Sequence, residues 1–83
     1  MFPFNPKTPL RFSLRAAGPA ELAIYDLAGR NVAHLVDGPL AAGEHSLVWN
    51  GIDDAGAPVS SGVYFARLEA LGDMQVRKMT LVK

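Results

Sequence analysis

Residues 47–68, LVWNGIDDAGAPVSSGVYFARL, hold the single Trp of the chain and one of its two Tyr. At the start of this stretch His45, Leu47 and Trp49 occupy every second position, which is the period of a strand with one buried face. From Gly62 onward, aromatic and β-branched residues follow with the same period and predict a second strand. We therefore expect two core strands joined by a loop, with Trp49 as the anchor of the first strand.

The loop between these two strands is rich in turn-forming residues and in side chains that carry oxygen. Asn50, Asp53 and Asp54 are candidate calcium ligands, because calcium binds clustered oxygen atoms. The same residue types bond their own backbone in turns, and the loop lacks the ligand order of an EF-hand. We expect turn chemistry to order this loop without a metal, and calcium bound by these three residues is the alternative.

Four further runs have the composition or the alternation of short strands. They lie at residues 10–15, 21–27, 32–36 and 74–82, and Gly and Pro separate them. Such regular punctuation predicts an all-β fold, an antiparallel β-sandwich of about seven strands. The residues expected in its core are Leu14, Leu22, Ile24, Trp49, Tyr64 and Leu68.

The segments between these strands are expected to be turns or extended connections. Three Pro within residues 1–9 predict an extended lead-in, because each Pro lacks a backbone donor. Residues 17–19 should end the first strand, and residues 37–43 should connect two others. Residues 10–83 then form the folded domain.

Composition limits the partners of the domain. The 83 residues suffice for one domain, and eight basic and eight acidic side chains cancel. We therefore expect no nucleic acid partner, since an attractive field is missing. The absence of Cys excludes disulfides and thiolate zinc sites. No run is long enough to predict membrane insertion, and no signal peptide is seen at the N-terminus. If the domain is exported, we expect it to come from a longer precursor whose signal lies elsewhere.

Side chains suited to catalysis are few. His34 and His45 lie on predicted strands, and a two-histidine metal site can be imagined, but the pattern supplies no further ligands. Ser60 and Ser61 precede Gly62 in a turn context and have no base beside them. We expect no catalytic residue, no cofactor and no enzymatic activity, with both histidines at the surface or the rim.

Four aromatic residues suggest a different kind of site. Trp49, Tyr25, Tyr64 and Phe65 would form a sugar-stacking platform if two of them faced solvent. Only Tyr25 clearly lies off the apolar face, so core packing is the preferred interpretation. An accessory carbohydrate-binding module is the alternative.

Six short motifs of the chain form a combination typical of a known family. They are PFNP (3–6), IYDLAGR (24–30), AGEH (42–45), VWNG (48–51), SGVY (61–64) and KMTLVK (78–83). Together they resemble the C-terminal sorting domain of the bacterial type IX secretion system, over nearly the whole chain. The part from Tyr25 to Leu68 is also similar to the immunoglobulin-like domain of the flagellar hook-capping protein. Asn50 departs from both patterns, which usually have Asp there.

This resemblance implies an immunoglobulin-like β-sandwich without catalysis of its own. It implies a domain at the C-terminus of a secreted cargo, which directs that cargo across the outer membrane to the cell surface. The partners would be the outer-membrane secretion machinery and the N-terminal cargo domains of a longer precursor. The location would be secreted or at the cell surface, after transit through the periplasm. A structural immunoglobulin-like module of the hook-capping type is the alternative.

Two sets of residues follow from these arguments. Arg77, Lys78 and Lys83 give the last predicted strand a basic tip, which a receptor could recognise by edge pairing and charge. The motif residues expected to build the fold are Tyr25, Asp26, Gly29, Arg30, Trp49, Gly51, Gly62 and Tyr64.

Overall fold

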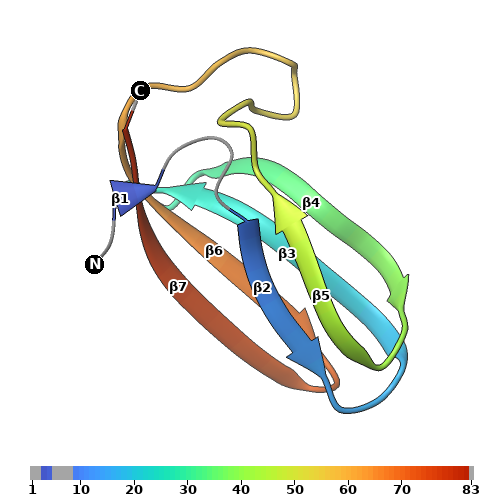
Figure 1. The fold of residues 1–83 in the computed structure, drawn as a ribbon. Coiled ribbons are helices and arrows are strands. Elements are labelled where there is room, and N and C mark those ends of the chain that lie inside the picture. Colours follow the sequence, from blue (N-terminus) through green and yellow to red (C-terminus); the bar gives the residue numbers. More distant parts are fainter. Residues whose placement is uncertain (1–2, 5–8, 83) are drawn as a thin grey trace.

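The chain folds into two β-sheets that pack face to face (Figure 1). The computed structural model describes residues 3–4 and 9–82. One sheet has the strand order β1-β7-β6-β3-β4 and the other pairs β2 with β5; every pair is antiparallel except β1 with β7. The strands are β1 (Pro3–Phe4), β2 (Pro9–Leu14), β3 (Gly18–Asp26), β4 (Asn31–Leu40), β5 (Gly43–Val48), β6 (Gly62–Ala70) and β7 (Asp73–Leu81).

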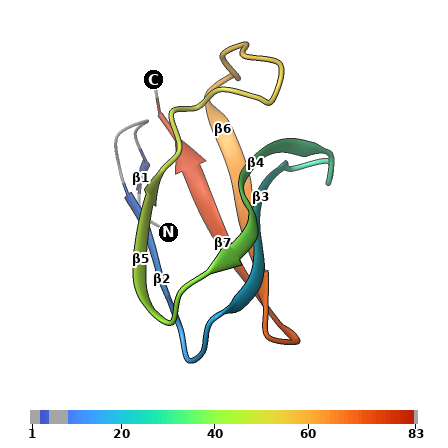
Figure 2. The ribbon, with the colours of Figure 1, turned by 90° about the vertical axis from the view of Figure 1, so that its right-hand side faces the viewer.

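This architecture confirms the predicted all-β sandwich. In the described residues, six strands of six to ten residues accompany the two-residue β1, close to the expected number of about seven. Figure 2 shows the β2–β5 layer beside the larger sheet, with the chain after β5 crossing to β6. The part of the chain that the structure describes contains no helix that could cross a bilayer.

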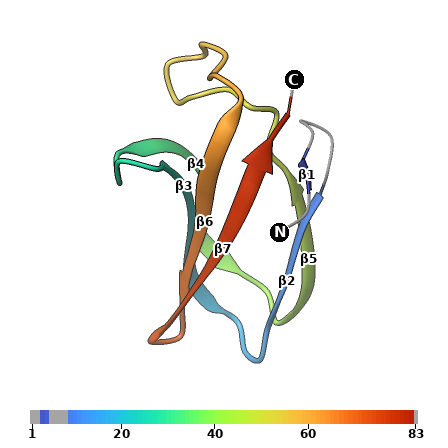
Figure 3. The same cartoon turned by 90° about the vertical axis from the view of Figure 1, so that its left-hand side faces the viewer.

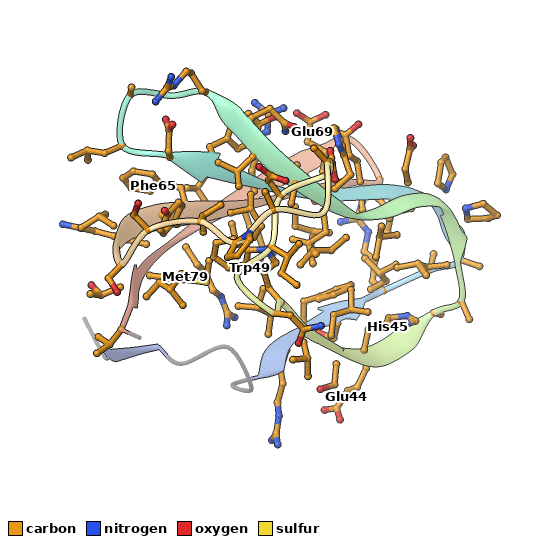
Figure 4. The ribbon with its side chains drawn as sticks, turned by 90° about the horizontal axis from the view of Figure 1, so that it is seen from above. Glu44, His45, Trp49, Phe65, Glu69 and Met79 are labelled. Atoms are coloured by element: carbon orange, nitrogen blue, oxygen red, sulfur yellow. The ribbon has the colours of Figure 1, made fainter. Side chains whose placement is uncertain are left out.

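The core lies between the two sheets, and its predicted members are all buried. Leu14, Leu22, Ile24, Trp49, Tyr64 and Leu68 are each at most 7% exposed. They are joined by Met79 and Leu81 from β7, because alternate residues of a strand face the same side. Figure 4 shows Trp49 and Met79 between the layers, whereas Glu44 lies on the outer side of β5.

Tight turns join the hairpins of the larger sheet. Leu71 and Gly72 connect β6 to β7 and have φ values of 56° and 78°. Two successive residues with positive φ match the twist of paired strands, which is why such turns usually contain Asn or Gly. Leu71 is therefore an unusual residue at this position. Its side chain is half-buried and lies beside Gly18.

Two segments that were predicted to be turns or connections are parts of strands in the structure. Residues 18–19 begin β3 and residues 37–39 belong to β4, with Pro19 opposite Pro39 in the ladder. Proline is tolerated here because β4 is an edge strand and the pairing of β3 with β6 begins only at Ala20. The prediction of turns at these positions was therefore wrong.

Two predicted boundaries also shift. β5 ends at Val48, so Trp49 and Asn50 start the loop rather than end the strand. The ladder stops there because Val48 pairs with Pro9, the first residue of β2. Within the predicted lead-in of residues 1–9, β1 pairs with the end of β7, while residues 1–2 and 5–8 lie outside the described part of the chain.

Candidate functional site

Trp49 and Tyr64 meet at one end of the sandwich and fix the loop that joins β5 to β6. Their rings pack edge to face with centroids 5.1 Å apart. The Trp49 Nε1–H donates to the Ile52 carbonyl oxygen at 3.1 Å, and the Tyr64 hydroxyl donates to the Ser60 carbonyl oxygen at 2.6 Å. Burial raises the pKa of the Tyr64 phenol, and the charge of Asp26 adds to this shift. Both motif aromatics therefore have a structural role.

The glycines of the same motifs shape the backbone around this pair. Gly51 is buried and has a φ of 70°, a conformation that favours glycine. Its carbonyl oxygen accepts a hydrogen bond of 2.9 Å from the Val59 N–H, which ties the two ends of the loop together. Gly62 begins β6 and has a φ of 157°. The loop is thus closed on itself before the chain enters β6.

Asp53 holds the tip of this loop through the backbone. Its Oδ1 accepts the N–H groups of Ala55 at 3.0 Å and Ala57 at 2.9 Å, and its own N–H donates to the Ala57 carbonyl oxygen at 2.9 Å. This is the turn chemistry predicted for the loop. Asn50 is exposed, and no group of three potential metal ligands occurs within the described residues.

Asp54 fastens the loop to the edge of β4. Its N–H donates to the Val32 carbonyl oxygen at 3.1 Å, and its Oδ1 accepts the His34 N–H at 2.9 Å. Its Oδ2 lies 2.7 Å from Nδ1 of the His34 ring. The bond between the two side chains raises the pKa of His34 and lowers the pKa of Asp54. We call this arrangement the His34–Asp54 clip.

The two histidines are not brought together. His34 lies on β4 of the larger sheet, while His45 lies on β5 of the smaller one. The His45 ring stacks on Phe12 with centroids 5.3 Å apart, and its Nε2 lies 2.7 Å from the Ala41 carbonyl oxygen. The imagined two-histidine metal site is therefore wrong, because the strands belong to different sheets.

Asp26 organises the turn between β3 and β4. Its Oδ1 accepts the N–H groups of Ala28 at 3.0 Å and Arg30 at 2.9 Å, and its Oδ2 lies 3.0 Å from Nε of Arg30. The bond from the Arg30 backbone is the main cause that lowers the pKa of Asp26. Gly29 donates its N–H to the Asp26 carbonyl oxygen at 3.0 Å and has a φ of 84°. These motif residues build the turn.

The outer face of the larger sheet carries the remaining aromatics. Tyr25 and Phe65 are opposite each other in the β3–β6 ladder and are both half-buried. The guanidinium of Arg67 lies 4.7 Å from the centre of the Tyr25 ring, between Glu21 at 3.9 Å and Glu69 at 3.3 Å. Trp49 and Tyr64 are in the core, as expected, but Phe65 lies beside Tyr25 off the apolar face, so the expectation that only Tyr25 does so was wrong.

The predicted basic tip is divided by the alternation of β7. Arg77 shares the face of the buried Met79 and Leu81, although Arg77 itself is exposed, whereas Lys78 lies on the outer face. Lys83 lies outside the described residues. β1 pairs with β7 at Thr80 and Leu81, so part of the last strand is already covered. A receptor therefore cannot add a strand at Thr80 and Leu81 while β1 is in place.

Sequence reasoning missed the His34–Asp54 clip and the hydroxyl bond of Tyr64. The clip joins residues 20 positions apart, and no local pattern indicates such a contact. The Tyr64 bond reaches back four residues to the carbonyl of Ser60, which lies before the strand. A Tyr just after the Ser-Ser-Gly turn was the available signal, because a buried Tyr hydroxyl needs a nearby acceptor.

The hydrogen bonds of Asp26, Asp53 and Asp54 hold turns and a strand edge of the immunoglobulin-like sandwich. The family model of the FlgD Ig-like domain matches residues 4–73. The chain therefore belongs to the FlgD Ig-like domain family.

A solved structure has the same fold. It is PorZ of Porphyromonas gingivalis, described as an essential bacterial surface component of the type-IX secretion system. The similarity has a TM-score of 0.63 at 20% sequence identity and covers 98% of this chain, which corresponds to 11% of the length of that protein. No curated protein sequence matches the chain.

Proposed function

We propose that this domain is a non-catalytic sorting domain, which directs an attached cargo protein across the outer membrane to the cell surface through a type IX secretion system. The observation that carries the proposal is the extent of the resemblance. The family match ends at residue 73, but the sorting-domain motifs continue through residues 78–83, and the likeness to the PorZ fold covers 98% of the chain. Its partners are the secretion machinery and the cargo that precedes it.

The surface chemistry supports recognition rather than catalysis. Arg77 and Lys78 are exposed on β7, and Val82 beyond the strand is 51% exposed. A receptor can reach these side chains without unfolding the domain. The motif residues Asp26, Trp49 and Tyr64 instead secure turns and the core, so the shared sequence maintains a fold that presents the last strand.

The test uses a fluorescent reporter fused before Met1, in a bacterium that carries the type IX machinery. Deleting Lys78 to Lys83 would remove Met79 and Leu81, which are buried, and would confuse export with folding. Removing only Val82 and Lys83 leaves the described core intact. We expect this truncated fusion to remain folded in the periplasm and to be lost from the cell surface.

A control distinguishes specific recognition of the basic residues at the end of the chain from an effect of net charge. Lys78→Gln with Lys83→Gln removes two charges at the end of the chain, and Arg15→Gln with Arg30→Gln removes two elsewhere. The side chains of Arg15 and its partner Asp73 are both exposed, so this pair contributes little to stability. Arg30 is 81% exposed, and Arg30→Gln keeps the backbone N–H that Asp26 accepts in the turn. Export should fall only in the first variant. Unchanged surface delivery of the folded truncated fusion would reject the sorting function.

The second candidate is a structural module of the hook-capping type, and the family match over residues 4–73 favours it. Such a module depends on its fold and its neighbouring domains, not on the last residues. Truncation at Leu81 would then leave assembly of the parent protein unchanged. Export that is insensitive to the truncation, together with normal assembly, would select this candidate.

A further inference from the structure

The two edge strands of the larger sheet differ in what covers them. Along β4, the His34–Asp54 clip occupies backbone groups at Val32 and His34, and Pro39 removes a donor further along. Along β7, β1 covers only Thr80 and Leu81. Within the described chain, residues 73–79 therefore have β6 on one side and no strand on the other. Alternate N–H and C=O groups of this segment point outward, as in any edge strand.

The sequence of this segment permits a further strand to be added. Residues 73–79 contain neither Pro nor Gly and remain in register with β6 throughout. On the outer face Met74 and Val76 are 59% and 55% exposed. On the opposite face Gln75 and Arg77 occupy positions that alternate with these two. A strand placed here would meet apolar side chains on one side and polar or cationic ones on the other.

The polar side of this edge borders a groove lined by residues of β2, β5 and β7, among them Glu44 on the outer side of β5. The groove has a volume of about 600 Å³. In Figure 3 the ribbon of β7 lies on one side and those of β2 and β5 on the other. A smaller pocket, which shares Arg11, Phe12, Gln75 and Arg77 with the groove, is also lined by Leu22, Ala66 and Leu68. The residues that supply the charge of the groove and its aromatic wall are Arg11, Phe12, Glu44, His45, Gln75 and Arg77.

The groove carries cations that the described chain does not neutralise. Ion pairs among the described residues involve Arg15, Arg30, His34 and Arg67, but neither Arg11 nor Arg77. Glu44 is the one acidic residue that lines this groove. Two arginines therefore face one carboxylate. An occupant with carboxylates on the groove side complements this charge.

An inward charge on an edge strand usually protects it from unspecific pairing. Arg77 has this effect on any apolar strand, because pairing would bury the guanidinium without a partner. The same residue admits a strand that brings a carboxylate, since a charge-assisted hydrogen bond then compensates the burial. Arg77 thus makes the edge selective rather than closed.

We propose that residues 73–79 of β7 form a β-augmentation site for an extended segment of a partner protein in which acidic and aliphatic residues alternate. The carboxylates lie in the groove beside Arg77 and Arg11, and the aliphatic side chains cover Met74 and Val76. Main-chain hydrogen bonds to β7 supply the part of the affinity that does not depend on the side chains of the partner. The inference concerns binding only and holds or fails independently of the proposed export function.

The test uses the full 83-residue chain and a peptide of seven residues, in which Val and Glu alternate and both ends are blocked. We expect nuclear magnetic resonance to show saturable binding, with slower amide exchange in residues 73–79. Methylating one set of alternate peptide nitrogens should abolish binding, and methylating the other set should not, because only alternate amides of a strand face one neighbour. Equal binding of the two methylated peptides would overturn strand pairing.

Matched variants test the charge. Arg77→Gln should weaken binding by about tenfold, the effect of one charge-assisted hydrogen bond. Lys78→Gln removes the same charge one residue away on the outer face and should change the affinity less than about twofold. An equal loss of peptide affinity in the two variants would overturn the preference for acidic residues. Equal affinity of a peptide with Gln in place of Glu would overturn it too. If the chain forms a dimer in which the amides of residues 73–79 exchange slowly without peptide, this edge binds a second copy of the chain and the proposal is rejected.

Discussion

Trp49 illustrates at the residue scale how one side chain serves both the core and a loop. The residue is 2% exposed, packs on Tyr64, and donates its indole N–H to the Ile52 carbonyl. Its position directly after β5 places it where the ladder has ended and the loop begins. Loss of this ring removes a central part of the core and also releases the loop.

Trp49→Ala should lower the free energy of unfolding by about 3 to 5 kcal/mol, the usual cost of truncating a large buried aromatic. The total free energy of unfolding of a small domain is about 5 to 15 kcal/mol, so the variant should be largely or partly unfolded at ambient temperature. Urea denaturation monitored by circular dichroism measures the change. Val48→Ala is the control, because Val48 is 47% exposed. Equal midpoints for the two variants would contradict the central role of Trp49.

The Tyr64 hydroxyl is tested in the same way. Tyr64→Phe keeps the ring against Trp49 and removes only the donor to the Ser60 carbonyl. We expect a loss of about 1 kcal/mol, the net contribution of a typical hydrogen bond. Tyr25→Phe is the matched control, since no hydrogen bond of its hydroxyl is found among the described residues. A loss no larger than that of the control would show that the Tyr64 bond contributes nothing.

At the scale of elements, the loop between β5 and β6 is held by groups that titrate. The His34–Asp54 clip is strongest when the imidazole is protonated and the carboxylate is ionised. The raised pKa of His34 gives a contribution that is fully present below its ordinary value of 6.5 and is lost as pH rises through the value in the folded state. The lowered pKa of Asp54 gives a contribution that is present above 3.8 and is lost at lower pH.

The melting temperature should reflect this window. The advantage of the parent chain over His34→Gln should be largest between pH 3.8 and pH 6.5, and it should shrink as the solution becomes alkaline. Differential scanning calorimetry across this range measures the advantage. Asp54→Asn should show the same flattened pH profile, because it removes the other charge. A constant difference between parent and His34→Gln at all pH values would argue against the clip.

The same loop should not require calcium. Asp53 already accepts two backbone N–H groups through Oδ1, and Asp54 is bound to His34. Calorimetric titration with calcium should therefore give no saturable heat, because the loop already orders itself through its own turn bonds. The variant with Asp53→Asn and Asp54→Asn is the control. Micromolar binding that disappears in this variant would favour the metal site over turn chemistry.

How much the sequence predicts depends on how local the cause is. The strand of Tyr64 and the turn at Gly29 follow from period-2 patterns and from Gly, which act within a few residues. Pro39 was misassigned because its effect depends on whether the strand lies at an edge, and a single strand does not reveal that. The His34–Asp54 clip depends on two elements meeting in space, so no segment predicts it alone.

On the scale of the whole molecule, the two sheets are unequal. The β2–β5 ribbon has only two strands, and such a pair is marginally stable without a surface to cover. The ribbon packs on the larger sheet through the buried Leu14 and through half-buried residues such as Phe12 and Leu47. In contrast, β3 and β6 lie inside the larger sheet with a strand on either side.

Native-state hydrogen exchange should reveal this inequality. Amides of β3 and β6 should exchange only on global unfolding, whereas those of β2 and β5 should open with a free energy lower by about 1 to 2 kcal/mol. Mass spectrometry of exchanged fragments can follow both groups. Phe12→Ala should widen the difference, because it weakens the contact of the ribbon with the larger sheet. Identical opening energies for the four strands would mean that the sandwich unfolds as one unit.

The parallel pairing of β1 with β7 has a mechanical consequence. Pro3 lies opposite Thr80 and Phe4 opposite Leu81, so the beginning and the end of the chain run side by side in the same direction. Tension between the two termini draws these strands along their own axes in opposite directions. All hydrogen bonds between β1 and β7 then bear the force at the same time, in shear. In contrast, the antiparallel hairpin of β3 and β4 would lose one residue pair at a time if its two ends were pulled apart. A load applied between β1 and the end of β7 therefore meets its first resistance where these two strands pair.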